Sequence, residues 1–435
     1  MKGINVIKNI LWNIGGAKLK KIVFFGWKAK SNFNESLSIL ENIIRNDVRV
    51  YYFGFEEYRQ AIENMGIKFF QYKDIRKNLE DIYKNETRPK FTVEDIVNRS
   101  SVFNRKLLEM FKEMAEYDLE KVKMILPNII FRDNAAVNGK IVASKLKKRT
   151  VGINCLITML NEDVKSDPVK LFGLFNSVDF TKVKGIKESG FYSRIINRHI
   201  KNSEELEVPY INPVHVVDGE DDINISFGGS LIQPDGKFNN KEYIVAKPLL
   251  RNMCQDLGHD VRLQEFIDSK EKLIYFATGS TIRASNKFYN IVINTVRRTN
   301  YNLIISVPNL SNNYNKKFPQ NVLVRDMINQ QKILERADLF ITAGGYNSVC
   351  EAVHNLVPMM VRPIINDQAV NAYKIKELGI GEVIKTDDID KESLLNYINI
   401  LINDQMYKSN LQKVKRNFQK SKDIEKILND ILINV

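Results

Sequence analysis

The sequence has few cysteines and no long apolar run, and each shortage excludes a class of protein. Its three cysteines, Cys155, Cys254 and Cys350, lie too far apart for a disulfide framework or a zinc site. No apolar run approaches the about 18 residues of a membrane-spanning helix. The N-terminal region also lacks the cleavage site of a secretory signal. A cytoplasmic protein is therefore predicted.

Negative charge is in deficit, since 65 Lys and Arg against 52 Asp and Glu leave a formal net charge of +13. The basic residues occur in short pieces such as 145–149, without the stripe typical of nucleic-acid binding, so no nucleic-acid partner is predicted. The charge suits a polyanionic ligand such as a nucleotide. Residues 1–18 leave two alternatives open: an amphipathic helix in peripheral contact with a membrane, or an element packed on the body.

Short apolar segments alternate with amphipathic helices in both halves of the chain. The strands expected in the first half cover residues 21–26, 49–53, 67–72, 127–133 and 150–155. The alternation restarts at 272–279. It predicts an α/β protein with two doubly wound, Rossmann-like domains that face a cleft.

Glycine, aspartate and asparagine gather between the two series, in residues 226–245. We therefore expect an N-terminal domain of residues 1–228 and a C-terminal domain of residues 229–410. The last helices, residues 411–435, are expected to pack back on the N-terminal domain. A ligand is expected at the carboxyl ends of the strands.

The stretch TAGGYNSVCEA joins an expected strand to an expected helix. Gly344 and Gly345 would let the backbone approach a phosphate, which the start of the helix favours. Asn347 and Ser348 add donors, and Glu351 lies where a carboxylate can accept two ribose hydroxyls. A plain helix cap with a capping box is the alternative explanation.

Asp367 and Gln368 open the next expected helix and are suited to sugar hydroxyls. Together with the glycine turn, they resemble the donor-binding segment of nucleotide-sugar glycosyltransferases. The most similar group is the macrolide-type family, which has the two-domain GT-B fold. Outside this segment, the resemblance covers nearly all of the chain apart from residues 1–18, 156–212 and about 232–268.

The resemblance implies further site residues. Gly279 and Ser280 match the turn that contacts phosphate, Met327 and Ile328 match the segment that holds the base, and Asp133 matches the catalytic aspartate. It also implies a UDP- or dTDP-sugar as co-substrate, a small-molecule acceptor, no metal and no other cofactor. Bacterial secondary metabolism is the setting that it suggests.

Two family histidines are missing. Ala343 stands where one contacts the diphosphate, and residues 30–35 replace the motif that supplies the general base, a group worth about 10²–10⁴ in rate. Arg283 and Arg325 are candidates for the missing charge. We predict an inverting hexosyltransferase for an acidic phenol, thiol or carboxylate, or one that uses Asp133 directly as base. The alternatives are a degenerate helper of an active paralogue and an epimerase-like enzyme.

Overall fold

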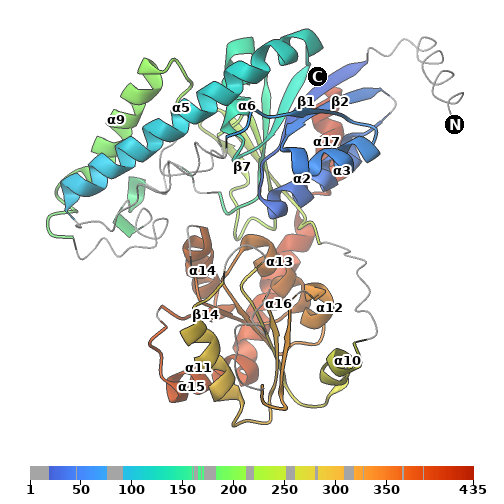
Figure 1. Cartoon of the computed structure of the whole chain (residues 1–435), viewed down its shortest axis with the longest axis vertical. Helices are drawn as coiled ribbons and strands as arrows, with labels where there is room; N and C mark the ends of the chain where they lie inside the picture. Colours follow the sequence, from blue (N-terminus) through green and yellow to red (C-terminus); the bar gives the residue numbers. More distant parts are fainter. Residues whose placement is uncertain are drawn as a thin grey trace, which may run out of the picture.

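The computed structural model describes residues 19–45, 47–75, 92–158, 160, 165–167, 169–170, 183–211, 220–250, 260–279, 283–307, 318–326, 328–364, 367–385 and 387–435, without the side chains of residues 30 and 31. These residues form two lobes, each built around one sheet (Figure 1). The two sheets confirm the predicted α/β architecture.

The first sheet has the strand order β3-β2-β1-β4-β5-β6-β8-β7. Its strands are β1 (Lys20–Phe25), β2 (Val48–Gly54), β3 (Lys68–Gln71), β4 (Ile129–Asp133), β5 (Thr150–Asn154), β6 (Ile223–Phe227), β7 (Gly236–Phe238) and β8 (Lys241–Ala246). All neighbours pair in parallel except β7 with β8. Every side chain of β4, β5 and β6 is buried, as expected of strands covered on both faces.

The predicted domain boundary between residues 228 and 229 falls inside this sheet, and the prediction was wrong there. Strand β8 pairs with β6 over five residues, so the first unit continues to Ala246. The glycines that suggested a linker serve instead in the turn between β6 and β7. Gly228 has a φ of +115°, a conformation that favours glycine.

Some helices of the first lobe cover the faces of its sheet, and others project from it. These helices are α2 (Lys30–Ile43), the 3-10 helix η2 (Glu56–Tyr58), α3 (Arg59–Asn64), α5 (Val93–Ile125), α6 (Val137–Leu146) and α9 (Phe191–Glu205). The long α5 and the adjacent α9 project sideways from this lobe (Figure 1). Exposed ion pairs, such as Arg105 with Glu205, join the two helices.

The second sheet has the order β11-β10-β9-β12-β13-β14, and every pairing is parallel. Its strands are β9 (Leu273–Ala277), β10 (Asn302–Ser306), β11 (Val322–Arg325), β12 (Leu339–Thr342), β13 (Met359–Val361) and β14 (Gly381–Val383). The helices of this lobe are α10 (Val261–Asp268), α11 (Asn286–Val296), α12 (Gln330–Leu334), α13 (Tyr346–Asn355), α14 (Asp367–Glu377) and α15 (Lys391–Asn403). The carboxyl ends of β9 and β12 lie side by side, which sets the place of the site.

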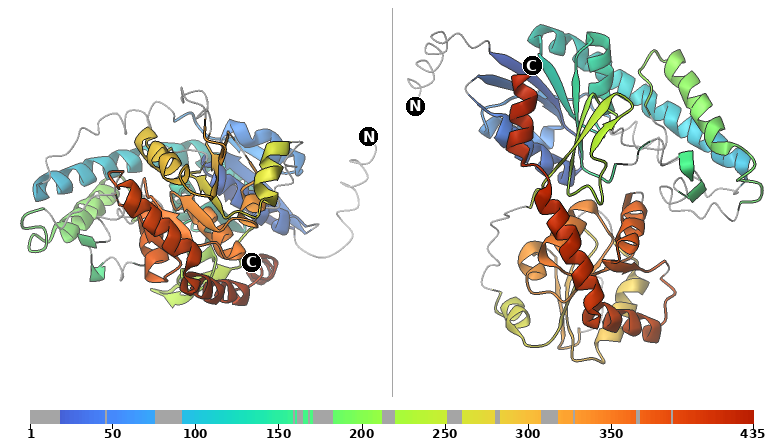
Figure 2. Two further views of the ribbon diagram at one scale, coloured as in Figure 1. Left: turned by 90° about the horizontal axis from the view of Figure 1, so that it is seen from below. Right: turned by 180° about the vertical axis from the view of Figure 1, so that it is seen from behind.

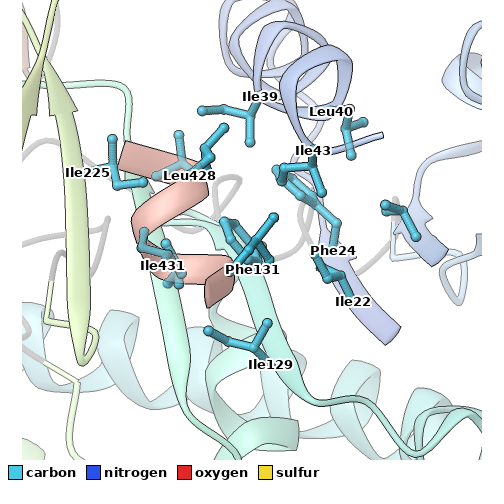
Figure 3. Packing of buried hydrophobic residues seen from close by; sticks show 14 of the residues in the cluster. Ile22, Phe24, Ile39, Leu40, Ile43, Ile129, Phe131, Ile225, Leu428 and Ile431 are labelled. Atoms are coloured by element: carbon cyan, nitrogen blue, oxygen red, sulfur yellow. The ribbon is translucent and has the colours of Figure 1, made fainter. Parts of the chain in front are cut away.

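The C-terminal segment divides between the two lobes. Helix α16 (Gln405–Lys420) packs Leu411, Val414 and Phe418 into the core of the second unit. Helix α17 (Ile424–Ile433) instead packs on the first sheet beside α2, where Leu428 and Ile431 join its core (Figure 3). Seen from behind, α16 follows the second lobe and leads to α17 on the first (Figure 2).

Candidate nucleotide-sugar site

The turn after β12 has the backbone that the glycine pair predicts. The strand ends at Thr342, and Gly344 then turns the chain with a φ of +85°. A side chain at Gly344 would also come within 2.7 Å of a neighbouring valine. Glycine is therefore required here by conformation and by packing.

Gly345 is different, because nothing in the described fold requires it to be glycine. It is the N-cap of α13, its φ is −60°, and no side chain makes a capping hydrogen bond. A Cβ atom at Gly345 would meet no heavy atom within 4 Å. The alternative in which Asn347, Ser348 and Glu351 form a cap and a capping box is therefore wrong. The helix start is left open to a group from outside.

Ser348 and Glu351 face α12 across a short polar contact. Gln330 Nε2 lies 3.1 Å from Ser348 Oγ and 2.5 Å from Glu351 Oε2. Tyr275 Oη donates to Gln330 Oε1 at 3.4 Å. Glu351 is only 8% exposed, so Gln330 fixes the orientation of the carboxylate that the sequence assigned to a ribose.

Helix α14 meets the same turn from the other side. Asn371 Nδ2 donates to the Gly344 carbonyl at 2.7 Å and to Asp367 Oδ2 at 3.4 Å. Burial raises the pKa of Asp367 to about 6, against the hydrogen bonds that lower it. Gln368 Oε1 accepts from the Ile364 amide at 2.9 Å. The structure thus brings Asp367 and Gln368 to the glycine turn.

The remaining donor residues lie on neighbouring turns. Strand β9 pairs with β12 so that Ala277 is opposite Thr342, and Gly279 follows with a φ of +95°. Ile328 packs partly buried against the core of the second unit. Ser280 and Met327 lie outside the described residues.

Arg325, one candidate for the missing charge, is held in an ion pair. Its guanidinium meets the Asp260 carboxylate at 2.5 and 2.9 Å, and this pairing lowers the pKa of Asp260. Asp260 is also the N-cap of α10. The pair therefore has a structural use, and the suggestion that Arg325 replaces the histidine is not supported.

The predicted catalytic aspartate ends β4 on the first sheet. Asp133 is 0% exposed, and its Oδ1 accepts from Asn32 Nδ2 at 3.1 Å and from the Ala135 amide at 2.7 Å. Its Oδ2 lies 3.6 Å from Cys155 Sγ. Burial raises the pKa of Asp133 to about 6, although these hydrogen bonds oppose the rise. The carboxylate is thus surrounded by protein, which argues against Asp133 as a direct base.

The two lobes meet at a buried hydrogen bond between α13 and the end of β6, near the buried Glu35, Cys155 and Cys350. Burial raises the pKa of Cys155, and the charges of Glu35 and Asp133 raise it further. The charge of Glu35 also acts on Cys350 of α13. From the same helix, Tyr346 Oη donates to the Phe227 carbonyl of β6. The two strand edges therefore meet at this point.

A buried ion pair holds the turn that carries Asp133. Arg132 and Asp221 are 0% and 1% exposed, and their side chains join through contacts of 2.9 and 2.7 Å. Arg132 Nη1 also donates to the Asn134 carbonyl at 2.9 Å. Gly152 leaves room for the pair, because a Cβ there would lie 2.2 Å from Asp221 Oδ2.

Sequence reasoning missed several of these residues. Asn32 was noted only as part of a motif without histidine, and nothing local links it to Asp133, which lies 101 residues away. Arg132 and Asp221 are 89 residues apart and carry no joint pattern. The sequence predicted that Met327 and Ile328, just before Gln330, hold the base. It gave no role to Gln330 itself, whose side chain lies 2.5 Å from the Glu351 carboxylate.

The described part of the chain contains neither a helix suited to cross a membrane nor a cluster suited to a metal ion. None of its helices combines the length and the apolar character needed to cross a membrane. Within the same residues, no group of three His, Cys, Asp or Glu side chains is arranged to hold a metal ion. Asp390 is the N-cap of α15, since its Oδ1 accepts from the Ser393 amide at 2.8 Å.

Two α/β lobes, each with a mainly parallel sheet flanked by helices, have the architecture of the GT-B glycosyltransferase fold. The crystal structure of CalG4, the calicheamicin glycosyltransferase, matches 95% of this chain and 98% of its own with a TM-score of 0.71 at 14% identity. The glycosyltransferase VinC in complex with DTDP matches 95% of this chain and 98% of its own with a TM-score of 0.65 at 12% identity. These matches confirm the predicted fold.

Sequence relatives agree with the fold. Residues 251–425 match the family model described as UDP-glucoronosyl and UDP-glucosyl transferase. The uncharacterized UDP-glucosyltransferase YojK of Bacillus subtilis is 22% identical over 416 residues, which cover 95% of this chain and 97% of YojK. The resemblance to the UDP-glycosyltransferase family and the prediction of a glycosyltransferase are confirmed. The helper and epimerase alternatives are not favoured.

Proposed function

We propose that the protein is an inverting, metal-independent hexosyltransferase that uses a UDP- or dTDP-sugar and a small-molecule acceptor. The second unit would bind the donor through Gly279, Ser280, Met327, Ile328, Gly344, Gly345, Asn347, Ser348, Glu351, Asp367 and Gln368. The first unit would bind the acceptor beside Asp133. Both sets of residues follow the carboxyl ends of parallel strands, where such folds bind ligands.

Gly345 is the observation that carries this proposal. A glycine that neither conformation nor packing requires, at the open start of a ten-residue helix, suits close approach of a phosphate. The amide groups and the positive end of α13 would stabilise the charge that grows on the leaving diphosphate. Asp367 and Gln368, held against the same turn, would receive the hexose hydroxyls.

The acceptor side supports an acidic acceptor. Because Asp133 is buried, we assign it a positioning role in which it holds the amide of Asn32 toward itself. An amide cannot take a proton at neutral pH, so the acceptor must ionise with little help. A phenol, a thiol or a carboxylate meets this requirement, whereas an ordinary alcohol does not.

The pure protein, incubated in EDTA with UDP- and dTDP-hexoses, tests the proposal. We expect nucleotide release and glycoside formation with a nitrophenol or a thiol, and slower transfer to an alcohol. Proton NMR of the product should show the anomer opposite to that of the donor. No transfer to any acidic acceptor with either nucleotide, both in EDTA and with added Mg²⁺, would overturn the proposal. Loss of activity in EDTA would overturn metal independence alone.

A further inference from the structure

A diphosphate at the turn after β12 would lack the cation that the resemblance leads one to expect, because Ala343 stands in its place. Two other arginines that end strands of this sheet are already used. Arg325 pairs with Asp260, and the Nε of Arg362 lies 2.7 Å from Asp387 Oδ1. The compensating charge, if the site has one, must come from elsewhere on this edge.

Arg283 lies on the turn after β9 and is exposed. Tyr289 Oη lies 3.3 Å from Thr278 Oγ1. Burial raises the pKa of Tyr289, and the hydrogen bonds of Thr278 and of the Ala284 backbone oppose this rise, together with the charge of Arg283. The backbone next to Arg283 therefore lies beside the Thr278 end of β9. Among the described residues, no ion pair occupies the Arg283 guanidinium.

The sheet register carries this charge to the glycine turn. Ala277 is paired with Thr342, so Thr278 and Ala343 follow at the same level on adjacent strands. Neighbouring strands lie about 4.8 Å apart. A long arginine side chain can span one strand spacing, and its planar fork suits two phosphate oxygens.

We infer that Arg283 supplies, from the turn after β9, the positive charge for the donor diphosphate that Ala343 cannot supply. This rests on the proposed function. The positive charge would then come from the turn after β9, and not from the turn after β12 where Ala343 lies. Because an arginine stays charged at all physiological pH values, nucleotide binding would also lose the pH dependence that a histidine confers.

Calorimetry with UDP, dTDP and uridine tests the inference. We expect Arg283→Gln to weaken UDP or dTDP binding about tenfold to hundredfold and to leave uridine binding unchanged. Arg283→Lys should retain part of the affinity. Arg298→Gln is the matched control, because it removes one exposed arginine just beyond the far end of α11. Wild-type affinity for the nucleotide should stay constant from about pH 7 to pH 9.

The outcomes separate the inference from the proposed function. If the wild type binds UDP or dTDP but Arg283→Gln behaves like Arg298→Gln, the inference is wrong and the donor site stands. Equal losses for the nucleotide and for uridine would indicate a structural defect and would also overturn it. If the wild type binds neither nucleotide, both ideas fail.

Discussion

The carboxyl edges of the two sheets have the same topology but opposite chemistry. On the first sheet, Asp133 is buried and its carboxylate is bonded to protein groups. On the second sheet, the helix after Gly345 starts without a side-chain cap, and a Cβ atom added to that glycine would meet no heavy atom of the described residues within 4 Å. The carboxylate at the first edge is satisfied by protein groups, whereas the helix at the second edge begins without a side-chain cap.

The proposed function assigns donor binding to the second edge and places no general base at the first. Donor binding depends mainly on backbone amides and on the placement of a helix, which survive the loss of a histidine. Deprotonation of an acceptor depends on a single titratable side chain. We therefore expect substitutions at the two edges to act on different measurements.

The largest effect is expected where a general base is introduced at the carboxyl end of β4, beside Asp133. Asn32→His would place an imidazole beside Asp133, and we expect transfer to an alcohol to rise by about 10²–10⁴-fold. Transfer to a nitrophenol should change little, since that acceptor ionises unaided. Initial rates with matched phenol and alcohol acceptors provide the measurement. The gain should disappear in Asn32→His with Asp133→Asn; an equal gain for both acceptors would contradict the proposed role.

In the first unit, loss of a buried carboxylate should lower the free energy of unfolding more than loss of an exposed one. Asp221→Asn leaves the Arg132 guanidinium buried without its partner, and we expect the free energy of unfolding to fall by about 3–5 kcal/mol. Urea denaturation measures the loss. The exposed Asp235, in the connection between β6 and β7, provides the control Asp235→Asn, which should change stability by less than about 0.5 kcal/mol. Equal losses would show that the buried pair contributes nothing special.

At the start of α13, one substitution should weaken nucleotide binding without lowering stability. Asp is a good N-cap, so Gly345→Asp should preserve or slightly raise the melting temperature. The same carboxylate would repel a diphosphate, and we expect about hundredfold weaker UDP or dTDP binding. Thermal denaturation and calorimetry on one sample test both statements. Gly190→Asp, at the N-cap of α9, should leave nucleotide binding unchanged. Retained affinity in Gly345→Asp would remove the helix start from the site.

The smallest expected effect concerns the pH dependence of stability that comes from the buried carboxyl group of Asp118. Burial raises the pKa of Asp118 on α5 to about 7, with Lys121 opposing the rise. A carboxyl whose folded pKa exceeds its unfolded value stabilises the fold at low pH and loses that contribution as pH rises through the folded pKa. The wild type should therefore be less stable at pH 8 than at pH 5. Asp118→Asn should reduce this difference by about 1–2 kcal/mol in urea titrations; an unchanged difference would refute the assignment.

Local patterns predicted much of the fold and the glycine turn after β12. The alternation of apolar segments and helices predicted both sheets, and Gly344 and Gly345 were recognised because their use depends on adjacent residues. Strands β6, β7 and β8 were not predicted, because the glycine-rich stretch around them resembles a linker. In the structure, Tyr243 and Ile244 of β8 are buried in the sheet. Exposure within a fold cannot be read from composition alone.

By itself, the sequence determined the two α/β units, the glycine turn and the absence of histidine at both family positions, because these depend on neighbouring residues and on residue type. Only the tertiary structure decided that Asp133 accepts a hydrogen bond from Asn32, that Arg325 is paired with Asp260, and that Arg132 is paired with Asp221. Each of these depends on which distant side chains the folded sheets bring within a few ångströms, and no periodicity along the chain records that distance.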